Sequence, residues 1–160
     1  MKLKLDANFY DLLSAFRGCN LRYLIVGGWA VSIHAQPRAT QDMDIFVDSE
    51  SANIEAVYEA LKSFGAPLDS INKEQFLEPG TFFRIGVPPC QIGIFPEIPG
   101  VKFEACWPNR LEVPLDREGL SANFISAEDL IAAKVASGRE QDIADVQAIR
   151  RVQQTKSARP

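Results

Sequence analysis

The sequence predicts an α+β fold, in which a mixed β-sheet has helices packed mainly on one of its faces. Two observations support this prediction. Apolar residues recur at helical spacing near both ends of the chain, whereas residues 82–124 contain short strand-like runs separated by prolines. A chain of 160 residues, of which 46% are hydrophobic, can bury one core. We therefore expect a single domain over residues 1–152 and a disordered tail over residues 153–160.

The first expected element is a helix that begins after Asp6, whose side chain can accept hydrogen bonds from the first backbone N–H groups. Gly18 and Asn20 are expected to end it. Its apolar face is built from residues three or four positions apart, namely Phe9, Leu12, Leu13 and Phe16.

A buried strand is expected at residues 23–26, because this run is apolar throughout. Gly27 and Gly28 follow, and glycine lets the backbone turn sharply and bring its N–H groups close to a ligand. A short helix over residues 29–35 then leads to the strand that contains the Asp-Met-Asp sequence at residues 42–44.

A second long helix is expected to begin at Ser49 or Ser51 and to end at Gly65, which Pro67 follows. The proline-rich residues 82–124 are expected to supply the remaining strands of the sheet. The apolar face of the helix consists of Ile54, Val57, Leu61 and Phe64.

Two helices are expected near the C-terminus. Ser126 resembles the start of a capping box, and Gly138 separates the helix that follows it from the last one. The apolar residues of the last helix are Ile143, Val146 and Ile149.

The spacing of Asp42 and Asp44 points to a metal site. Residues two apart in a strand lie on the same face, roughly 6–7 Å from each other, so both carboxylates project together. Hard cations such as Mg2+ bind one or two carboxylates together with substrate phosphates. Gly27 and Gly28 precede a helix, where backbone N–H groups favour an anion. The alternatives are a solvated strand end and an ordinary turn.

The order of these features resembles the nucleotidyltransferase superfamily of the DNA polymerase beta type, in which a Gly-Gly or Gly-Ser turn and a short helix precede Asp-x-Asp. Segments 26–31 and 37–44 are similar to those of small bacterial members related to abortive-infection (AbiE-type) toxins and aminoglycoside nucleotidyltransferases. Segments 83–89 and 129–145 extend the resemblance, which covers roughly residues 20–150.

The resemblance implies that the chain binds a nucleoside triphosphate with Mg2+ or Mn2+, and that Asp42 and Asp44 hold the metal as catalytic residues. Arg38 is expected to reach phosphate through its guanidinium fork and Thr40 through its hydroxyl. The candidate nucleotide-binding residues are Gly27, Gly28, Arg38, Thr40 and Lys134.

One position departs from the family pattern. The family places a third carboxylate on a neighbouring strand, and Gly93 stands there in segment 91–95. That acid helps to hold the metal and accepts the proton of the attacking hydroxyl. Its loss leaves open whether this chain catalyses the transfer. Glu97 or Glu104 could replace it, a water could fill the gap, or the chain could bind nucleotide without turning it over.

Three other residues have both a functional and a structural interpretation. Lys134 either contacts phosphate or forms ion pairs with Asp142 and Asp145 that hold two helices together. Trp29 either stacks on a base or packs in the core. His34, the only histidine, could act as a catalytic base but is expected to pack at the end of its helix, because metal-assisted nucleotidyl transfer does not require a histidine.

The composition argues against several classes of protein. A net charge of −4 argues against a general nucleic-acid-binding surface, which needs clustered Lys and Arg. Three cysteines without metal-ligand spacing argue against a disulfide framework or zinc site, and no apolar run reaches the roughly 20 residues of a membrane span. We therefore expect a cytoplasmic protein that does not associate with membranes.

Three functions remain open at this point. The first is an Mg-dependent nucleotidyltransferase that transfers a nucleoside monophosphate to a hydroxyl of an RNA end, a protein or a small molecule. The second is a catalytically degenerate fold that acts as a nucleotide-binding or toxin–antitoxin partner protein with a cognate protein partner. The third is a structural α/β domain without a ligand.

Overall fold

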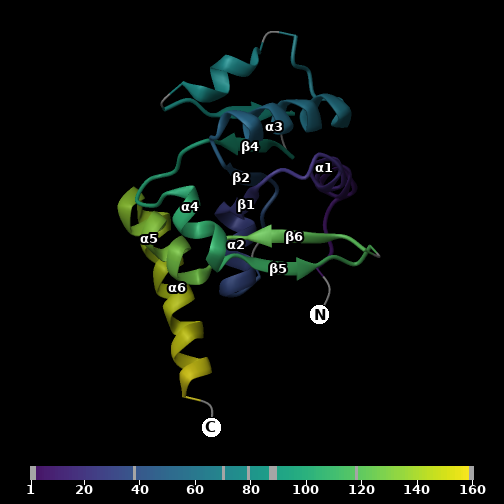
Figure 1. The fold of residues 1–160 in the computed structure, drawn as a ribbon. Helices are drawn as coiled ribbons and strands as arrows, with labels where there is room; N and C mark the ends of the chain where they lie inside the picture. Colours follow the sequence, from purple (N-terminus) through teal and green to yellow (C-terminus); the bar gives the residue numbers. More distant parts are fainter. Residues whose placement is uncertain are drawn as a thin grey trace.

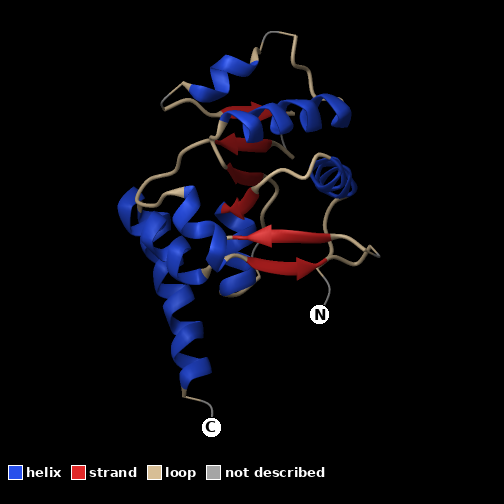
Figure 2. Cartoon of the chain, viewed as in Figure 1, coloured by secondary structure: helices blue, strands red, loops and turns tan. Residues whose placement is uncertain are grey.

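A computed structural model describes residues 3–37, 39–69, 71–78, 80–86, 90–117 and 119–158 of the chain. Arg38, one of the candidate nucleotide-binding residues, lies outside the described residues, as do residues 87–89. Figure 2 shows the strands in the middle of the molecule with helices around them.

A six-stranded mixed sheet is formed in the order β3-β4-β2-β1-β6-β5. Strand β1 pairs antiparallel with β2 and parallel with β6, β2 pairs parallel with β4, and the outer pairs β3–β4 and β5–β6 are antiparallel. The strands are β1 (Tyr23–Val26), β2 (Met43–Val47), β3 (Phe83–Ile85), β4 (Ile92–Phe95), β5 (Leu111–Pro114) and β6 (Ser121–Phe124). The predicted mixed sheet and α+β class are confirmed.

The helices begin and end at the predicted signals in most cases. Asp6 caps the first helix by accepting a hydrogen bond from the Asn8 N–H, and Ser126 caps the fifth. Gly65 and Gly138 adopt the left-handed conformation at two helix ends. The helices are α1 (Ala7–Gly18), α2 (Gly27–His34), α3 (Ser51–Phe64), α4 (Phe103–Cys106), α5 (Ala127–Ser137) and α6 (Glu140–Ser157), with short 3-10 helices at Lys73–Leu77 and Trp107–Asn109 (Figure 1).

The core includes the predicted apolar face of α1 and the inward residues of β2. Met43, Ile45 and Val47 are fully buried, as the alternation along β2 predicted. Trp29 packs edge-on against Phe9, with ring centroids 6.2 Å apart, so its core interpretation is confirmed. The central strands β1 and β2 are thereby packed into the core; β1 leads into α2, and β2 contains Asp44 and directly follows Asp42.

Helix α6 is longer than the sequence indicated. We expected residues 153–160 to be a disordered tail, but α6 continues to Ser157 and projects from the rest of the molecule (Figure 1). Gln153 also donates a hydrogen bond to Glu128 of α5 at 3.2 Å. The prediction was wrong over residues 153–157, because a polar sequence without glycine or proline does not interrupt helical hydrogen bonding.

Among the residues that the structure describes, no helix combines the length and the apolar character that crossing a bilayer requires.

Candidate functional site

An open pocket of about 520 Å³, here called the β2 pocket, lies where strand β2 begins and helix α2 starts. Its lining residues are Gly28, Ala39, Thr40, Gln41, Asp42 and Asp44. Four residues that the sequence singled out therefore meet around one cavity, although they come from three successive segments. Lys134 is not part of the lining.

Gly27 brings the backbone turn into contact with Asp44. Its φ of +67° lies in the left-handed region, and α2 begins at Gly27 itself rather than at Trp29 as expected. A Cβ atom at Gly27 would lie 2.5 Å from Oδ2 of Asp44. Both the backbone conformation and the close approach therefore require glycine at this position.

We expect Gly27→Ala to destabilise the folded protein by about 1–3 kcal/mol, because alanine is strained at this φ and its methyl group displaces the Asp44 carboxylate. Urea unfolding measures the change. Gly18→Ala is the matched control, since a Cβ there meets no atom within 4 Å. Equal stability of the two variants would show that the close approach to Asp44 is wrong.

Asp44 has a carboxylate oxygen that is buried without compensation. Its Oδ1 is buried, and no donor among the described residues forms a hydrogen bond with it. Burial is the main reason why the pKa of Asp44 lies above its ordinary value; the positive charge of Arg84 opposes this shift, and the negative charge of Asp42 adds to it. A bound cation would satisfy this oxygen.

Asp42 lies just before β2 and is held by the neighbouring segment. Its Oδ1 accepts a hydrogen bond from the backbone N–H of Gln91 at 3.0 Å. The hydroxyl of Thr40 donates to the backbone oxygen of Asp42 at 3.4 Å. The two aspartates are thus not both within the strand, yet both line the β2 pocket with their charges close enough to interact.

Gly93 lies where the sequence placed the missing acid. Strand β4 runs parallel to β2, and Gly93 is paired with Asp44. A Cβ at Gly93 would lie 2.9 Å from Oδ1 of Asp44 and 2.7 Å from Cε2 of Phe95. The space that a carboxylate would need is therefore occupied by the Phe95 ring.

The alternative acids do not complete a three-carboxylate site. In the part of the chain that the structure describes, no group of three His, Cys, Asp or Glu side chains could hold a metal ion together. Glu97 and Glu104, both exposed, therefore do not join Asp42 and Asp44. Two aspartates are the carboxylates that the β2 pocket offers.

Two arginines near Asp44 were missed by the sequence reasoning. Arg84 of β3 is paired with Gly93, so Arg84, Gly93 and Asp44 form one row across three adjacent strands. The charges of Arg84, Lys134 and Arg139 all lower the pKa of Asp44. No sequence rule places β3 beside β4 and β2, although the segment that contains Arg84 was part of the family resemblance.

Lys134 forms a buried ion-pair network at the junction of α5 and α6. Its Nζ lies 3.2 Å from Asp142 and 2.9 Å from Asp145, and Nε of Arg139 lies 2.8 Å from Asp142. Burial favours protonation of Asp142, but the hydrogen bonds from Arg139 and Lys134 outweigh it and hold the pKa of Asp142 at about 2. The structural ion pairs that the sequence offered as the alternative are present, and a nucleotide contact of Lys134 stays a prediction.

His34 has a packing contact at the end of α2. Its Nε2 donates a hydrogen bond to the backbone oxygen of Ile125 at 2.7 Å, and burial lowers the pKa of its imidazole. This agrees with the packing interpretation.

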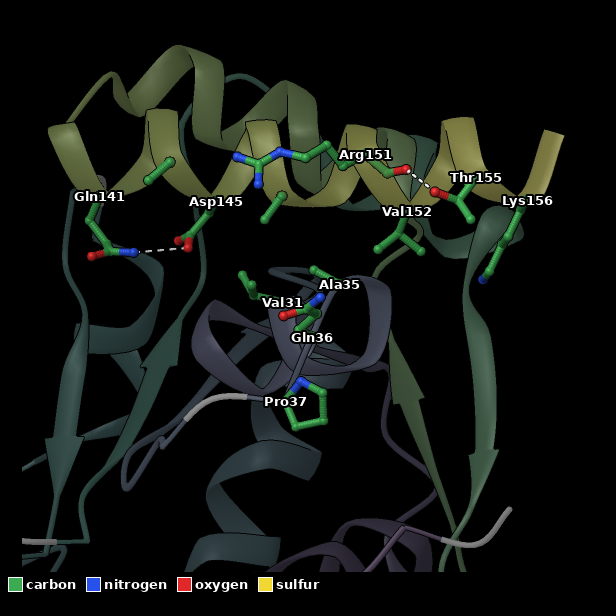
Figure 3. Close-up of a pocket in the computed structure, with 12 residues that line it drawn as sticks. Val31, Ala35, Gln36, Pro37, Gln141, Asp145, Arg151, Val152, Thr155 and Lys156 are labelled. Carbon is green, nitrogen blue, oxygen red and sulfur yellow. Dashed lines mark hydrogen bonds between the residues drawn. The ribbon is translucent and has the colours of Figure 1, made fainter. Parts of the chain in front are cut away.

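A larger hollow of about 730 Å³ lies between α2 and α6 and shares no residue with the β2 pocket. Figure 3 shows Val31 and Pro37 on one side, facing Asp145, Arg151 and Lys156 of α6. Charges of both signs line this hollow. Its lining residues include one acid, Asp145, and so do not offer the pair of carboxylates that distinguishes the β2 pocket.

Comparisons with known proteins identify a family and two similar folds. Residues 3–156 match the model of a family described as "Nucleotidyltransferase of unknown function (DUF6036)". The fold is similar to that of the lincosamide antibiotic adenylyltransferase LnuA in its lincomycin-bound crystal structure, with a TM-score of 0.56 and 19% identity over 92% of this chain and 98% of that chain.

It is also similar to an antigenic nucleotidyltransferase-like protein from Paracoccidioides brasiliensis, with a TM-score of 0.50 and 17% identity over 89% of this chain and 74% of that chain. No curated protein sequence matches the chain. At these identities the two crystal structures show a shared fold.

Proposed function

The chain belongs to this family of nucleotidyltransferases, and on that premise we propose that it binds a nucleoside triphosphate with a divalent cation in the β2 pocket. The hydroxyl oxygen of an acceptor then bonds to the α-phosphorus, pyrophosphate leaves, and the nucleoside monophosphate is transferred. One observation carries the proposal. Asp42 and Asp44 line a pocket at the start of α2, and one Asp44 oxygen is buried without a hydrogen-bond donor among the described residues.

The residues present fit a hard divalent cation. Asp42 and Asp44 offer carboxylate oxygens, which Mg2+ and Mn2+ prefer, and the uncompensated Oδ1 of Asp44 is a ligand without another partner among the described residues. Such an ion, when bound, neutralises charge on the polyphosphate and makes its phosphorus more electrophilic.

The protein's own groups would orient the triphosphate. The first backbone N–H groups of a helix have no partner within it, which favours an anion there. Helix α2 begins with Gly27 and Gly28, and Gly28 lines the β2 pocket. The Thr40 hydroxyl lines the same pocket. Lys134 and Arg139 add positive electrostatic potential around Asp44. The potential at the β2 pocket is therefore less negative than the net charge of −4 alone would suggest.

The acceptor remains a hydroxyl of an RNA end, a protein or a small molecule. LnuA, which has a similar length and fold, is an adenylyltransferase whose structure contains the antibiotic lincomycin. This supports testing small hydroxyl-bearing molecules first.

A second candidate function is nucleotide binding without transfer, including a role as the partner of another protein. The specific observation that favours it is the Phe95 ring at the position of the absent third carboxylate. Without that carboxylate, the described lining of the β2 pocket offers no acid beyond Asp42 and Asp44, which are assigned to the cation, to accept the proton of the attacking hydroxyl.

The proposal is tested by nucleotide binding and label transfer. We expect at least one of ATP, CTP, GTP and UTP with Mg2+ to raise the melting temperature of the wild type, because a ligand that binds only the folded state stabilises it. We also expect transfer of α-phosphate label to a hydroxyl acceptor. Asp42→Asn should abolish both signals, whereas Glu104→Gln, an exposed acid outside the pocket, should preserve them.

A double variant separates transfer from binding alone. Gly93→Asp by itself would collide with the Phe95 ring, so the variant must be Gly93→Asp combined with Phe95→Val. Label transfer by the double variant but not by the wild type would support the second candidate. If none of the four triphosphates binds the wild type, both candidates fail.

A further inference from the structure

Two stacked phenylalanines stand beside Asp44 on the same face of the sheet. Phe82 and Phe95 have ring centroids 5.3 Å apart and ring planes 13° apart. Phe82 is 52% exposed, so one of the two rings is available to a ligand. The register places Phe95 beside Phe46, two residues along β2 from Asp44, and side chains two apart share a face.

The stacked pair adjoins the carboxylate oxygen that lacks a donor. Cε2 of Phe95 and Oδ1 of Asp44 both lie within 3.0 Å of the point where a Cβ of Gly93 would stand, at 2.7 and 2.9 Å. Gly93 therefore makes room for an aromatic ring next to the β2 pocket. This is a structural reason for glycine at the position where the family pattern has an acid.

Arg84 adds a positive charge to the same place. Its guanidinium carbon lies 5.8 Å from the centroid of the Phe82 ring, and Arg84 is paired with Gly93 in the row that leads to Asp44. Arg84 is exposed on β3, which is the edge strand of the sheet. A third carboxylate would repel a phosphate; glycine at this position removes that repulsion, and the arginine attracts the phosphate.

We propose that Phe82 and Arg84 form a nucleotide subsite beside the β2 pocket, in which a planar base stacks on the Phe82 ring and the attached phosphate pairs with Arg84. Bases stack on aromatic side chains without regard to sequence, and the guanidinium fork matches phosphate oxygens. The proposal rests on the proposed function. Its ligand is either the nucleoside triphosphate itself or a nucleotide at the end of an RNA acceptor, which share this chemistry.

The test compares Phe82→Ala and Arg84→Gln with two matched controls by isothermal titration calorimetry. Leu111→Ala removes a half-exposed apolar side chain from β5 at the opposite edge of the sheet, and Arg150→Gln removes an exposed charge from α6. The ligands are MgATP, magnesium tripolyphosphate, and a short oligoribonucleotide added together with a non-hydrolysable MgATP analogue.

We expect Phe82→Ala to weaken binding of one base-containing ligand about 5- to 150-fold, the range that corresponds to loss of one base–aromatic stack. Binding of tripolyphosphate, which has no base, should not change. We expect Arg84→Gln to weaken binding of the same base-containing ligand about tenfold, and more strongly at low salt. Both controls should bind as the wild type does.

The pattern of losses identifies the ligand. Weaker MgATP binding by Phe82→Ala would assign the subsite to the triphosphate, and weaker oligoribonucleotide binding alone would assign it to the acceptor. If both variants bind every ligand as the wild type does, while Asp44→Asn loses tripolyphosphate, the subsite is wrong and the proposed function stands. If the wild type binds the oligoribonucleotide through Phe82 but binds no triphosphate, the subsite stands and the proposed function fails.

Discussion

Asp44→Asn is expected to raise the melting temperature of the free protein and to abolish its stabilisation by MgATP. The buried Oδ1 of Asp44 costs stability because no donor in the described part of the chain compensates it, and a neutral amide lowers that cost. We expect a gain of about 1 kcal/mol, or roughly 3 °C for a chain of this size. Differential scanning fluorimetry without and with MgATP measures both effects.

The loss of the ligand response should be the larger effect. A ligand present at 100 times its Kd stabilises the folded state by about 2.7 kcal/mol, and this shift disappears when a metal-binding carboxylate is removed. Asp69→Asn, which changes an exposed carboxylate, is the control for the charge change. A lower melting temperature of the free Asp44→Asn protein than of the wild type would contradict the structure around Oδ1. A rise of its melting temperature with MgATP equal to that of the wild type would contradict the metal role of Asp44.

The stability gain of Asp44→Asn should depend on pH in a defined direction. Because burial raises the pKa of Asp44 in the folded state, the wild type loses stability as the pH rises from the ordinary value of 3.8 through the raised pKa. The advantage of asparagine should therefore be complete at neutral pH and vanish below pH 3.8. Urea unfolding at a series of pH values measures it.

Lys134→Met is expected to destabilise the protein by about 3–5 kcal/mol, because it leaves two buried carboxylates without their shared cation. Asp142 and Asp145 are only 1% and 4% exposed, so the folded protein leaves both carboxylates little contact with water. Urea unfolding measures the loss. Lys156→Met, which removes an exposed lysine from α6, should change stability by less than about 0.5 kcal/mol.

A rescue variant separates the structural role of Lys134 from a nucleotide contact. Adding Asp142→Asn and Asp145→Asn to Lys134→Met removes the unpaired charges and should restore part of the stability. If this triple variant binds MgATP with the Kd of the wild type, Lys134 has a structural role alone. A Kd raised tenfold or more would support the phosphate contact that the resemblance implied.

The same network should weaken in acid. The pKa of Asp142 is about 2 in the folded protein, below its ordinary value of 3.8, so its ionised form stabilises the fold above pH 3.8. That contribution should be lost as the pH falls from 3.8 toward 2. Loss of helicity followed by circular dichroism over this range would show it.

Local signals in the sequence predicted most of the elements and pointed to the residues of the candidate site. Asp6, Ser126, Gly65 and Gly138 act at helix ends because capping depends on a few neighbouring residues. The polar end of α6 was misjudged, since composition alone does not show whether a helix continues.

The amino-acid sequence by itself determined that a glycine turn precedes an Asp-Met-Asp strand and that Gly93 stands where a third acid is usual. Only the tertiary structure decided that the Phe95 ring occupies this place and that Arg84 lies in the same row as Asp44. The physical reason is that alternation along a strand sets which face a side chain uses, whereas the neighbours across the sheet depend on long-range pairing and register.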